Sequence, residues 1–275
     1  MRFISIIILL TISIVSFSQT SGSGVTDIDG NTYPTVIIGN QEWMAENLKT
    51  SKYSNGVNIP NVTDNIQWSN LTDGAYCFYN NDANNNQIYG KLYNYYCVIN
   101  SNNLCPNGWH VPTVSEWDEL RIFLDPTDAT SGGQMKSNST LWTSPNVGAT
   151  NSSGFSAIPG GFRNNNETTS GIGVFSGIGT MAWFWTSEEV NLLSANGRYL
   201  INVDDPLFTG AGNKNDAFSI RCMKDQTTGL FEVIQINDEI LHITNILGQS
   251  IEKVPNQILI IYYKSGAVKK VYITE

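Results

Sequence analysis

The stretch CPNGWHVPTVSEW, residues 105–117, decides the fold of this chain. A cysteine is followed by a Pro-Asn-Gly turn, a tryptophan, a second proline and a second tryptophan. Thr113 precedes Glu116 by three residues, the spacing of a capping box, in which each side chain bonds the other residue's backbone N–H. The spacing predicts a short helix from about Pro112 to Leu124, held in place both by packing and by the nearby cysteine.

The composition describes a polar but weakly charged protein. Hydrophobic residues make up 41% of the 275 residues, enough for a core, whereas charged residues make up only 14%. The net charge is −9 and the pI is near 4.7. Nucleic acids bind surfaces rich in lysine and arginine, and no such patch is visible. We therefore expect no nucleic-acid partner.

The N-terminus has the pattern of a secretory signal peptide at residues 1–18. Arg2 precedes an apolar run of about a dozen residues, and Ser16 and Ser18 are the small residues of a cleavage site. The run is shorter than the ~20 residues of a membrane span, which makes a membrane anchor the weaker alternative. We expect a flexible leader at 19–24 and an exported protein without a membrane span.

Export places four cysteines in an oxidising compartment, where disulfides form. Their spacing allows three pairings, and it contains no CxxC motif that would favour the alternative of a zinc site. We favour the pairs Cys77–Cys97, across two probable strands, and Cys105–Cys222, across a loop of more than a hundred residues.

Further motifs follow the opening stretch in a recognisable order. The β-prone runs 35–38 and 41–44 flank a Gly-Asn turn and predict a hairpin. The other motifs are WMAENL at 43–48, YGKLYNYY at 89–96, GGFR at 160–163, FWTSEE at 184–189 and SIRCMKD at 219–225. Together with residues 105–117, they resemble the Fibrobacter succinogenes major paralogous domain over residues 25–225.

The resemblance implies an α+β fold of the C-type-lectin-like and formylglycine-generating-enzyme-like group. Such a domain is loop-rich and mixed, with few short helices. It also implies that Cys222 meets the cysteine beside the helix. The residues of the motifs that it marks as scaffold are Trp109, His110, Pro112, Glu116, Trp117, Arg163 and Arg221.

Residues 226–275 differ in composition from the rest and predict a small all-β domain. Short β-prone segments alternate with turn dipeptides, and lysines concentrate here. The pieces 243–251, 255–263 and 265–273 resemble a C-terminal sorting domain of the type IX secretion system of Bacteroidetes, which implies the secretion machinery as a partner. A small β-module that caps the first domain is the alternative.

No nucleophile or metal-hydrolase motif is present, and we expect no catalytic residue and no enzymatic activity. The fold group contains an oxidase, the formylglycine-generating enzyme, which uses a close pair of cysteines with copper. The four cysteines here do not match that pair, so an oxidase is the enzyme alternative.

Two sets of residues are candidates for ligand binding. Trp183, Phe184 and Trp185 form the densest aromatic group, and one of the tryptophans should be buried while the other offers a platform for a sugar. Asparagines and an acid in a nearby loop would supply polar contacts. The residues of this first set are Trp183, Trp185, Asn164, Asn165 and Glu167.

The second set consists of oxygen-bearing residues late in the chain, and it raises the alternative of a structural calcium ion. The candidates are Asp204, Asp205, Asn213, Asn215 and Asp216. Asp and Asn also form turns, and that interpretation stays open beside the first. Otherwise we expect no cofactor.

These observations predict a secreted or outer-membrane surface-attached protein whose role is binding or adhesion. The partner would be a glycan or a surface protein. The alternatives are a structural subunit of a surface assembly without a small ligand and, second, the oxidase.

Overall fold

A computed structural model shows two units, formed by residues 1–225 and 226–275, which are described separately. Strand residues outnumber helical residues, at 34% against 15%, so the fold is mixed and mostly β with few short helices, as predicted. No helix in the described part of the chain is long and apolar enough to cross a membrane. The described residues are 19–165, 173–226, 240–245, 248–251, 257–264 and 268–273.

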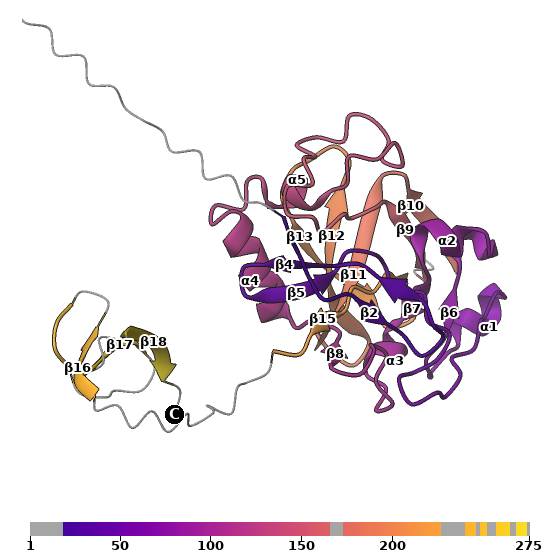
Figure 1. The fold of residues 1–275 in the computed structure, drawn as a ribbon. Helices are drawn as coiled ribbons and strands as arrows, with labels where there is room; N and C mark the ends of the chain where they lie inside the picture. Colours follow the sequence, from indigo (N-terminus) through magenta and orange to yellow (C-terminus); the bar gives the residue numbers. More distant parts are fainter. Residues whose placement is uncertain are drawn as a thin grey trace, which may run out of the picture. The chain divides into compact units, whose positions relative to one another are not determined.

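The first unit contains a five-stranded sheet in the order β1-β4-β5-β15-β8 (Figure 1). Its centre is the predicted hairpin, in which Gly39 turns the chain with a φ of 62° that favours glycine. The strands are β1 (Thr20–Ser21), β4 (Thr35–Ile38), β5 (Gln41–Met44), β8 (Trp109–His110) and β15 (Met223–Lys224). The sheet thus joins both ends of the unit to the stretch 105–117 through β8.

The expectation of a flexible leader at 19–24 is wrong. Thr20 lies opposite Ile37 in an antiparallel pair, and the backbone N–H of Gly22 donates to the carbonyl oxygen of Thr35 at 2.9 Å. The backbone N–H of Ser23 donates to a carboxylate oxygen of Glu42 at 2.5 Å. The leader is ordered because the edge of β4 offers unpaired backbone groups that it can bond.

The second sheet of this unit has eight strands, in the order β13-β12-β11-β9-β14-β7-β6, with β10 paired to β9. A separate pair, β2 (Val25–Thr26) and β3 (Thr32–Tyr33), stands apart from both sheets. The strands of the large sheet are β6 (Tyr76–Cys77), β7 (Leu92–Asn94), β9 (Gly160–Asn164), β10 (Val174–Ile178), β11 (Met181–Glu189), β12 (Ser194–Ile201), β13 (Phe208–Asn213) and β14 (Ala217–Phe218).

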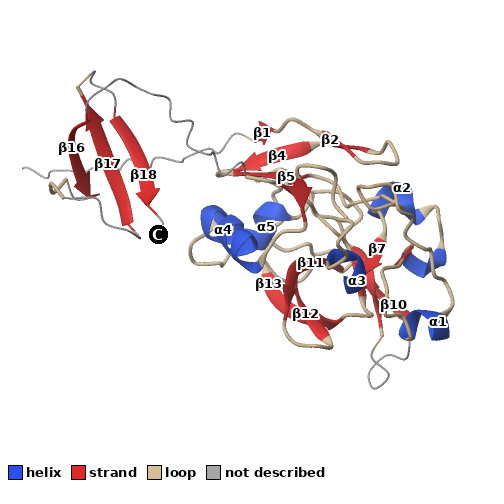
Figure 2. Ribbon diagram, turned by 90° about the horizontal axis from the view of Figure 1, so that it is seen from below, coloured by secondary structure: helices blue, strands red, loops and turns tan. Residues whose placement is uncertain are grey.

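The predicted helix is present as α4 (Val114–Leu124), and both halves of its capping box are formed. Its Trp117 packs against Trp43 of β5, with ring centroids 4.8 Å apart, and against Phe184 of β11 at 5.6 Å. The helix therefore fills the space between the two sheets (Figure 2). The other helices are short: α1 (Asn65–Ser69), η1 (Tyr79–Asn81), α2 (Asn85–Tyr89), α3 (Tyr95–Val98) and α5 (Ser131–Met135).

The cysteines form one of the two predicted bridges. Cys105 and Cys222 are bonded, with their Cα atoms 5.9 Å apart. The predicted Cys77–Cys97 bridge is wrong, because both residues are free and buried. Cys77 lies opposite Leu92 in the β6–β7 pair, and the chain enters α3 before it reaches Cys97. The two thiols consequently face different parts of the core.

The second unit is a three-stranded antiparallel sheet in the order β16-β17-β18, in keeping with the predicted all-β tail. Its strands are β16 (Ile240–Asn245), β17 (Gln257–Tyr263) and β18 (Val268–Ile273). His242 stacks on Tyr262 across the first pair, with ring centroids 4.2 Å apart.

Candidate ligand-binding site

Five aromatic rings form a continuous row across the large sheet. The ring centroids of Trp185 and Phe218 are 4.0 Å apart, and Phe218 lies 4.7 Å from Trp183. Trp183 stacks on Tyr199 at 4.3 Å, and Tyr199 stacks on Phe208 at 5.1 Å. The row therefore runs from the core outward to half-buried rings on β12 and β13.

Strand geometry explains this row. Side chains two residues apart on a strand share a face, which puts Trp183 and Trp185 on the same side of β11. Trp183 lies opposite Tyr199 on β12, which lies opposite Phe208 on β13, so each ring meets its cross-strand neighbour. Trp185 is fully buried and its indole N–H donates to the carbonyl oxygen of Tyr93 at 2.8 Å. Of the two tryptophans, only Trp183 reaches the surface, and it is half-buried.

A hollow of about 350 Å³ opens beside Trp183, over strands that lie next to one another in Figure 1. We call it the aromatic groove, and its principal lining residues are Phe162, Asn164, Trp183, Asn213, Asp216 and Phe218. Gly210 and Gly212 on β13 make room for it. A Cβ at Gly210 would lie 2.6 Å from the Trp183 ring, and one at Gly212 would lie 2.7 Å from the Phe218 ring.

Asp216 is the acidic group of the groove. One carboxylate oxygen accepts from the backbone N–H of Asn165 at 2.7 Å, and the other accepts from that of Asn213 at 2.8 Å. The residue is only 8% exposed. Burial raises the pKa of Asp216 to about 6, although these two hydrogen bonds oppose the shift. Keeping the group ionised at pH 7 costs the fold about 3 kcal/mol, which two backbone amides do not offset.

Two further polar atoms at the groove lack hydrogen bonds. The indole Nε1 of Trp183 and the side-chain oxygen of Asn165 are buried without a partner in the described structure. Buried polar groups are satisfied in most native sites, and exceptions concentrate where something else binds. The groove therefore combines aromatic surface, amide groups and an acid with polar atoms that are not yet satisfied.

The fold brings the two predicted sets together in part. Trp183, Asn164 and Asn165 were expected to bind a sugar, and Asn213 and Asp216 to bind calcium, yet these five residues meet at one groove. Glu167, the remaining polar candidate of the first set, lies outside the described residues.

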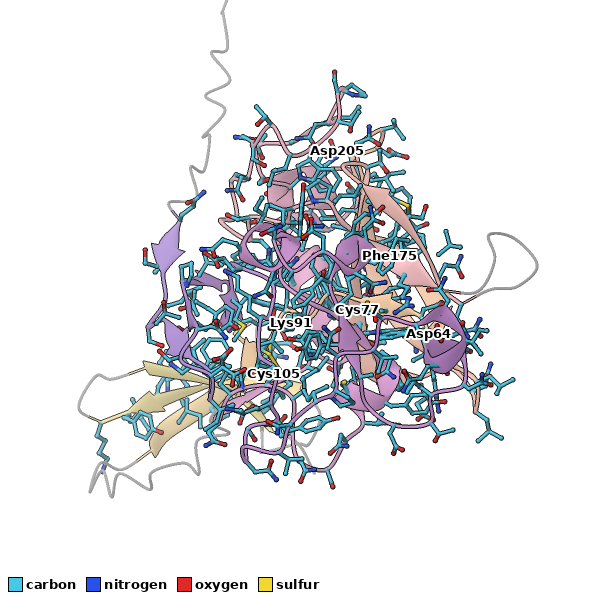
Figure 3. The ribbon with its side chains drawn as sticks, turned by 90° about the vertical axis from the view of Figure 1, so that its right-hand side faces the viewer. Asp64, Cys77, Lys91, Cys105, Phe175 and Asp205 are labelled. Atoms are coloured by element: carbon cyan, nitrogen blue, oxygen red, sulfur yellow. A yellow bond between two sulfur atoms is a disulfide. The ribbon has the colours of Figure 1, made fainter. Side chains whose placement is uncertain are left out.

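The structure does not bring the five calcium candidates together in one place. Asp204 and Asp205 follow β12 at the end of the β12–β13 hairpin opposite Asn213, a separation of about 17 Å along a strand. Asp205 lies at the upper end of the unit in Figure 3. The amide of Asn215 donates to the backbone carbonyl oxygens of three residues near α1, so it holds a turn.

A buried lysine occupies the place where the first half of that set could have held a cation. The ammonium group of Lys136 donates to the carbonyl oxygens of Val147, Ile201 and Asp204 at 2.6, 3.0 and 2.6 Å. These oxygens are the kind of ligand that calcium uses. Within the described residues, no cluster of three His, Cys, Asp or Glu side chains could hold a metal ion.

His110 is held between two carboxylates. Its Nδ1 lies 2.6 Å from Asp225, and its Nε2 lies 3.0 Å from Glu116. The hydrogen bond to Glu116 raises the pKa of His110 above its usual value, against the opposing effect of burial. The imidazole therefore ties the start of α4 to the last residue of the first unit.

Arg221 and Arg163 are buried, and each guanidinium group donates several hydrogen bonds. The Arg221 guanidinium donates to Asn47 at 2.7 Å and to the carbonyl oxygens of Met44 and Phe155 at 2.9 and 2.6 Å. Arg163 is buried against Trp68, with its guanidinium carbon 4.3 Å from the ring centroid. Neither side chain lines the aromatic groove, and both connect loops to strands.

The free cysteines do not resemble a reactive pair. Burial raises the pKa of both Cys77 and Cys97 to about 12. Thiolates, not thiols, act as nucleophiles and metal ligands. Cys105 and Cys222 are joined to each other.

Analysis of the sequence missed the half of the groove that lies on β12 and β13. Tyr199 and Phe208 were not candidates, and neither was the run TGAG at 209–212. Small residues that alternate on a strand beside aromatic strands leave space above the sheet. That alternation was the available signal.

The fold and the groove together define a disulfide-stapled, mostly β domain with a recessed aromatic surface. The chain belongs to the family of the Fibrobacter succinogenes major domain, whose family model matches residues 36–224. No curated protein and no solved structure matches the chain in comparison. The family name describes a domain and indicates no ligand.

Proposed function

We propose that this protein is a secreted or surface-attached binding protein and that the aromatic groove is its recognition site. The proposed partner is a glycan, or a glycan-bearing surface protein. One observation carries the proposal: Trp183 stands half-buried at a hollow lined by amides and a carboxyl group. Ligand sites are concave, mostly apolar, and contain a few convergent polar groups.

The chemistry of the groove suits a sugar. Phe162 and Trp183 offer apolar surface against which a sugar ring can pack. The exposed Asn213 offers an amide that both donates and accepts hydrogen bonds to hydroxyl groups. The small residues of β13 let a flat ring approach the strand.

Export and sorting are part of the proposal. We propose that residues 1–18 are removed as a signal peptide and that residues 226–275 act as a type IX sorting domain. The first unit would then be a C-type-lectin-like domain that functions outside the cell. Deletion of 226–275 in the native host should retain the protein in the periplasm, and normal export of the truncated chain would contradict the sorting role.

Binding to immobilised polysaccharides tests the recognition site. Trp183→Phe keeps the packing against Tyr199 and removes the indole, and Asn213→Ala removes an exposed amide at the rim. We expect each variant to bind at least tenfold more weakly than the wild type, with an unchanged circular dichroism spectrum. Asn138→Ala, an exposed asparagine in another loop, is the matched control and should bind normally.

The alternative is a structural subunit of a surface assembly without a small ligand. In that case no polysaccharide would bind to the wild type, and neither groove variant would alter the behaviour of the protein. We propose no enzymatic activity.

A further inference from the structure

The aromatic groove has one ionisable group among its described residues, the carboxyl group of Asp216. The rings of Phe162, Trp183 and Phe218 surround the same hollow. Trp183 is in edge contact with Phe162, with centroids 6.0 Å apart, so the rings form a continuous wall. The ionised carboxyl group in this partly enclosed hollow attracts positive charge.

No cation of the described chain compensates this acid. The hydrogen bonds to Asp216 come from two neutral backbone amides. The nearest lysine in the sequence, Lys214, is engaged elsewhere: its ammonium nitrogen lies 2.8 Å from Glu189 and 5.9 Å from the ring centroid of Tyr95. Residues 166–172, the segment that follows Asn165, contain no lysine or arginine. A ligand with a positive charge would therefore meet an acid that no described side chain neutralises.

We infer that the groove binds a protonated amine carried on a saccharide, with the ammonium group at Asp216 and the sugar ring against Trp183. This inference rests on the proposed function, because it names the class of ligand for the same groove. A charge-assisted hydrogen bond to the carboxylate is stronger than one between neutral groups.

The shape of the groove favours an amino sugar over a lysine side chain. A volume of about 350 Å³ exceeds the needs of a single alkyl chain. The amide of Asn213 and the hydroxyl group of Ser194 line the hollow in addition to the acid. These groups match the hydroxyl groups of a sugar ring, and an alkyl chain would gain no hydrogen bond from them.

The experiment compares three tetrasaccharides at pH 7 by isothermal titration calorimetry: β-1,4-linked glucosamine, its N-acetylated counterpart, and the neutral glucose analogue. The full-length mature protein is used. We expect glucosamine to bind at least tenfold more tightly than either neutral ligand. Asp216→Asn should remove that preference. Asp204→Asn removes the same charge at the far end of the hairpin and should keep it.

A measurement on the wild type covers the case in which Asp216→Asn does not fold. The pKa of Asp216 is raised to about 6 by burial, so the carboxylate is mostly lost at pH 5. Loss of the carboxylate alone would weaken the binding of glucosamine about tenfold between pH 7 and pH 5, and the fuller protonation of the sugar amines at pH 5 reduces the expected fall to several-fold. The affinity for the N-acetylated ligand should stay constant across this range.

The outcomes separate the two proposals. Equal affinity for all three saccharides, with loss of binding in Trp183→Phe, would overturn the amine inference and leave the binding function standing. Failure of all three ligands to bind would overturn both. Tight binding of an oligolysine peptide, without binding of glucosamine, would overturn the assignment to a saccharide.

Discussion

The first unit contains two regions that differ in how their charges are compensated. One is the region around α4, with His110, Arg221 and the Cys105–Cys222 bridge, which we call the corner; the other is the aromatic groove. In the corner, His110 has a carboxylate on each side, and Arg221 donates to four oxygens. In the groove, Asp216 accepts from two neutral amides and has no counter-charge among the residues that the structure describes. A region that satisfies its own charges serves the fold, whereas a region that leaves one unsatisfied is available to a ligand.

The family motif at 105–117 therefore lies apart from the aromatic groove, which we propose as the ligand-binding site. The disulfide between Cys105 and Cys222 and the capping box of α4 fix the corner from within. The groove depends on loops and on the β11–β13 strands, where rigid elements present a recessed surface. In the function that we propose, the scaffold supports the groove and takes no part in binding.

The largest expected effect comes from breaking the corner at Arg221. Arg221→Lys keeps the charge but cannot reach the oxygens of Asn47, Phe155 and Ser156 together. Each buried acceptor left without a donor costs about 1–3 kcal/mol, so we expect the free energy of unfolding to fall by about 4 kcal/mol or more. Urea denaturation measures it. Arg121→Lys on the surface of α4 is the control, and an equally small change in both variants would contradict the role of Arg221.

The next effect comes from the disulfide. Replacement of Cys105 and Cys222 by alanine should lower the free energy of unfolding by about 2–5 kcal/mol, because the bridge closes a loop with a sequence separation of 117. Chemical denaturation with and without the substitutions measures the change. The double variant Cys77→Ala and Cys97→Ala is the matched comparison. Its effect should come from lost packing and should not depend on reductant.

Ionisation of the buried Asp216 in the groove should make the protein less stable as pH rises from 4 to 6. Burial raises the pKa of Asp216 to about 6 in the folded state. A group whose folded pKa is raised stabilises the fold below its unfolded pKa of ~3.9, and this stabilisation is lost as pH rises through the folded pKa. The stability difference between the wild type and Asp216→Asn should shift by up to about 3 kcal/mol between pH 4 and pH 7. A pH-independent difference, as expected for Asp204→Asn, would contradict the uncompensated state of Asp216.

The smallest effect concerns His110, whose charge the corner compensates. Its hydrogen bond to Glu116 raises its pKa, so its contribution is present below pH 6.5 and is lost as pH rises through the folded pKa. Burial opposes ionisation of Glu116, but bonds from His110 and Thr113 outweigh it and lower the pKa of Glu116, so its contribution is lost at acid pH. His110→Gln should cost up to about 1 kcal/mol at pH 5.5 and less at pH 8. Thermal melts at the two pH values measure this, and an equal cost at both would contradict the ion pair.

Features that depend on nearby residues could be predicted from the sequence. The capping box needs only Thr113 and Glu116, and the hairpin at 35–44 needs only two β-prone runs and a turn. The pairing of Cys105 with Cys222 followed from the family's order of motifs. These features were recoverable because local spacing or a shared motif specifies them.

Features that depend on distant partners could not be predicted in the same way. Residues 19–24 are held in place by pairing with the edge of β4. Their own Ser- and Gly-rich sequence does not indicate this partner. The register of β6 and β7 separates Cys77 from Cys97. The meeting of Asn165 with Asp216, 51 residues apart, requires β9 and β14 to be neighbours in the sheet.

The most direct test of the binding site uses the indole N–H of Trp183 as a reporter. In a ¹⁵N-labelled protein, its signal is assigned by its disappearance in Trp183→Phe, and that of Trp185 by Trp185→Phe. During titration with the glucosamine tetrasaccharide at pH 7, the Trp183 signal should shift in a saturable way, and the signal of the fully buried Trp185 should shift far less. A Trp183 signal that does not move while the saccharide binds elsewhere, or a saccharide that does not bind at all, would contradict the assignment of the aromatic groove as the recognition site.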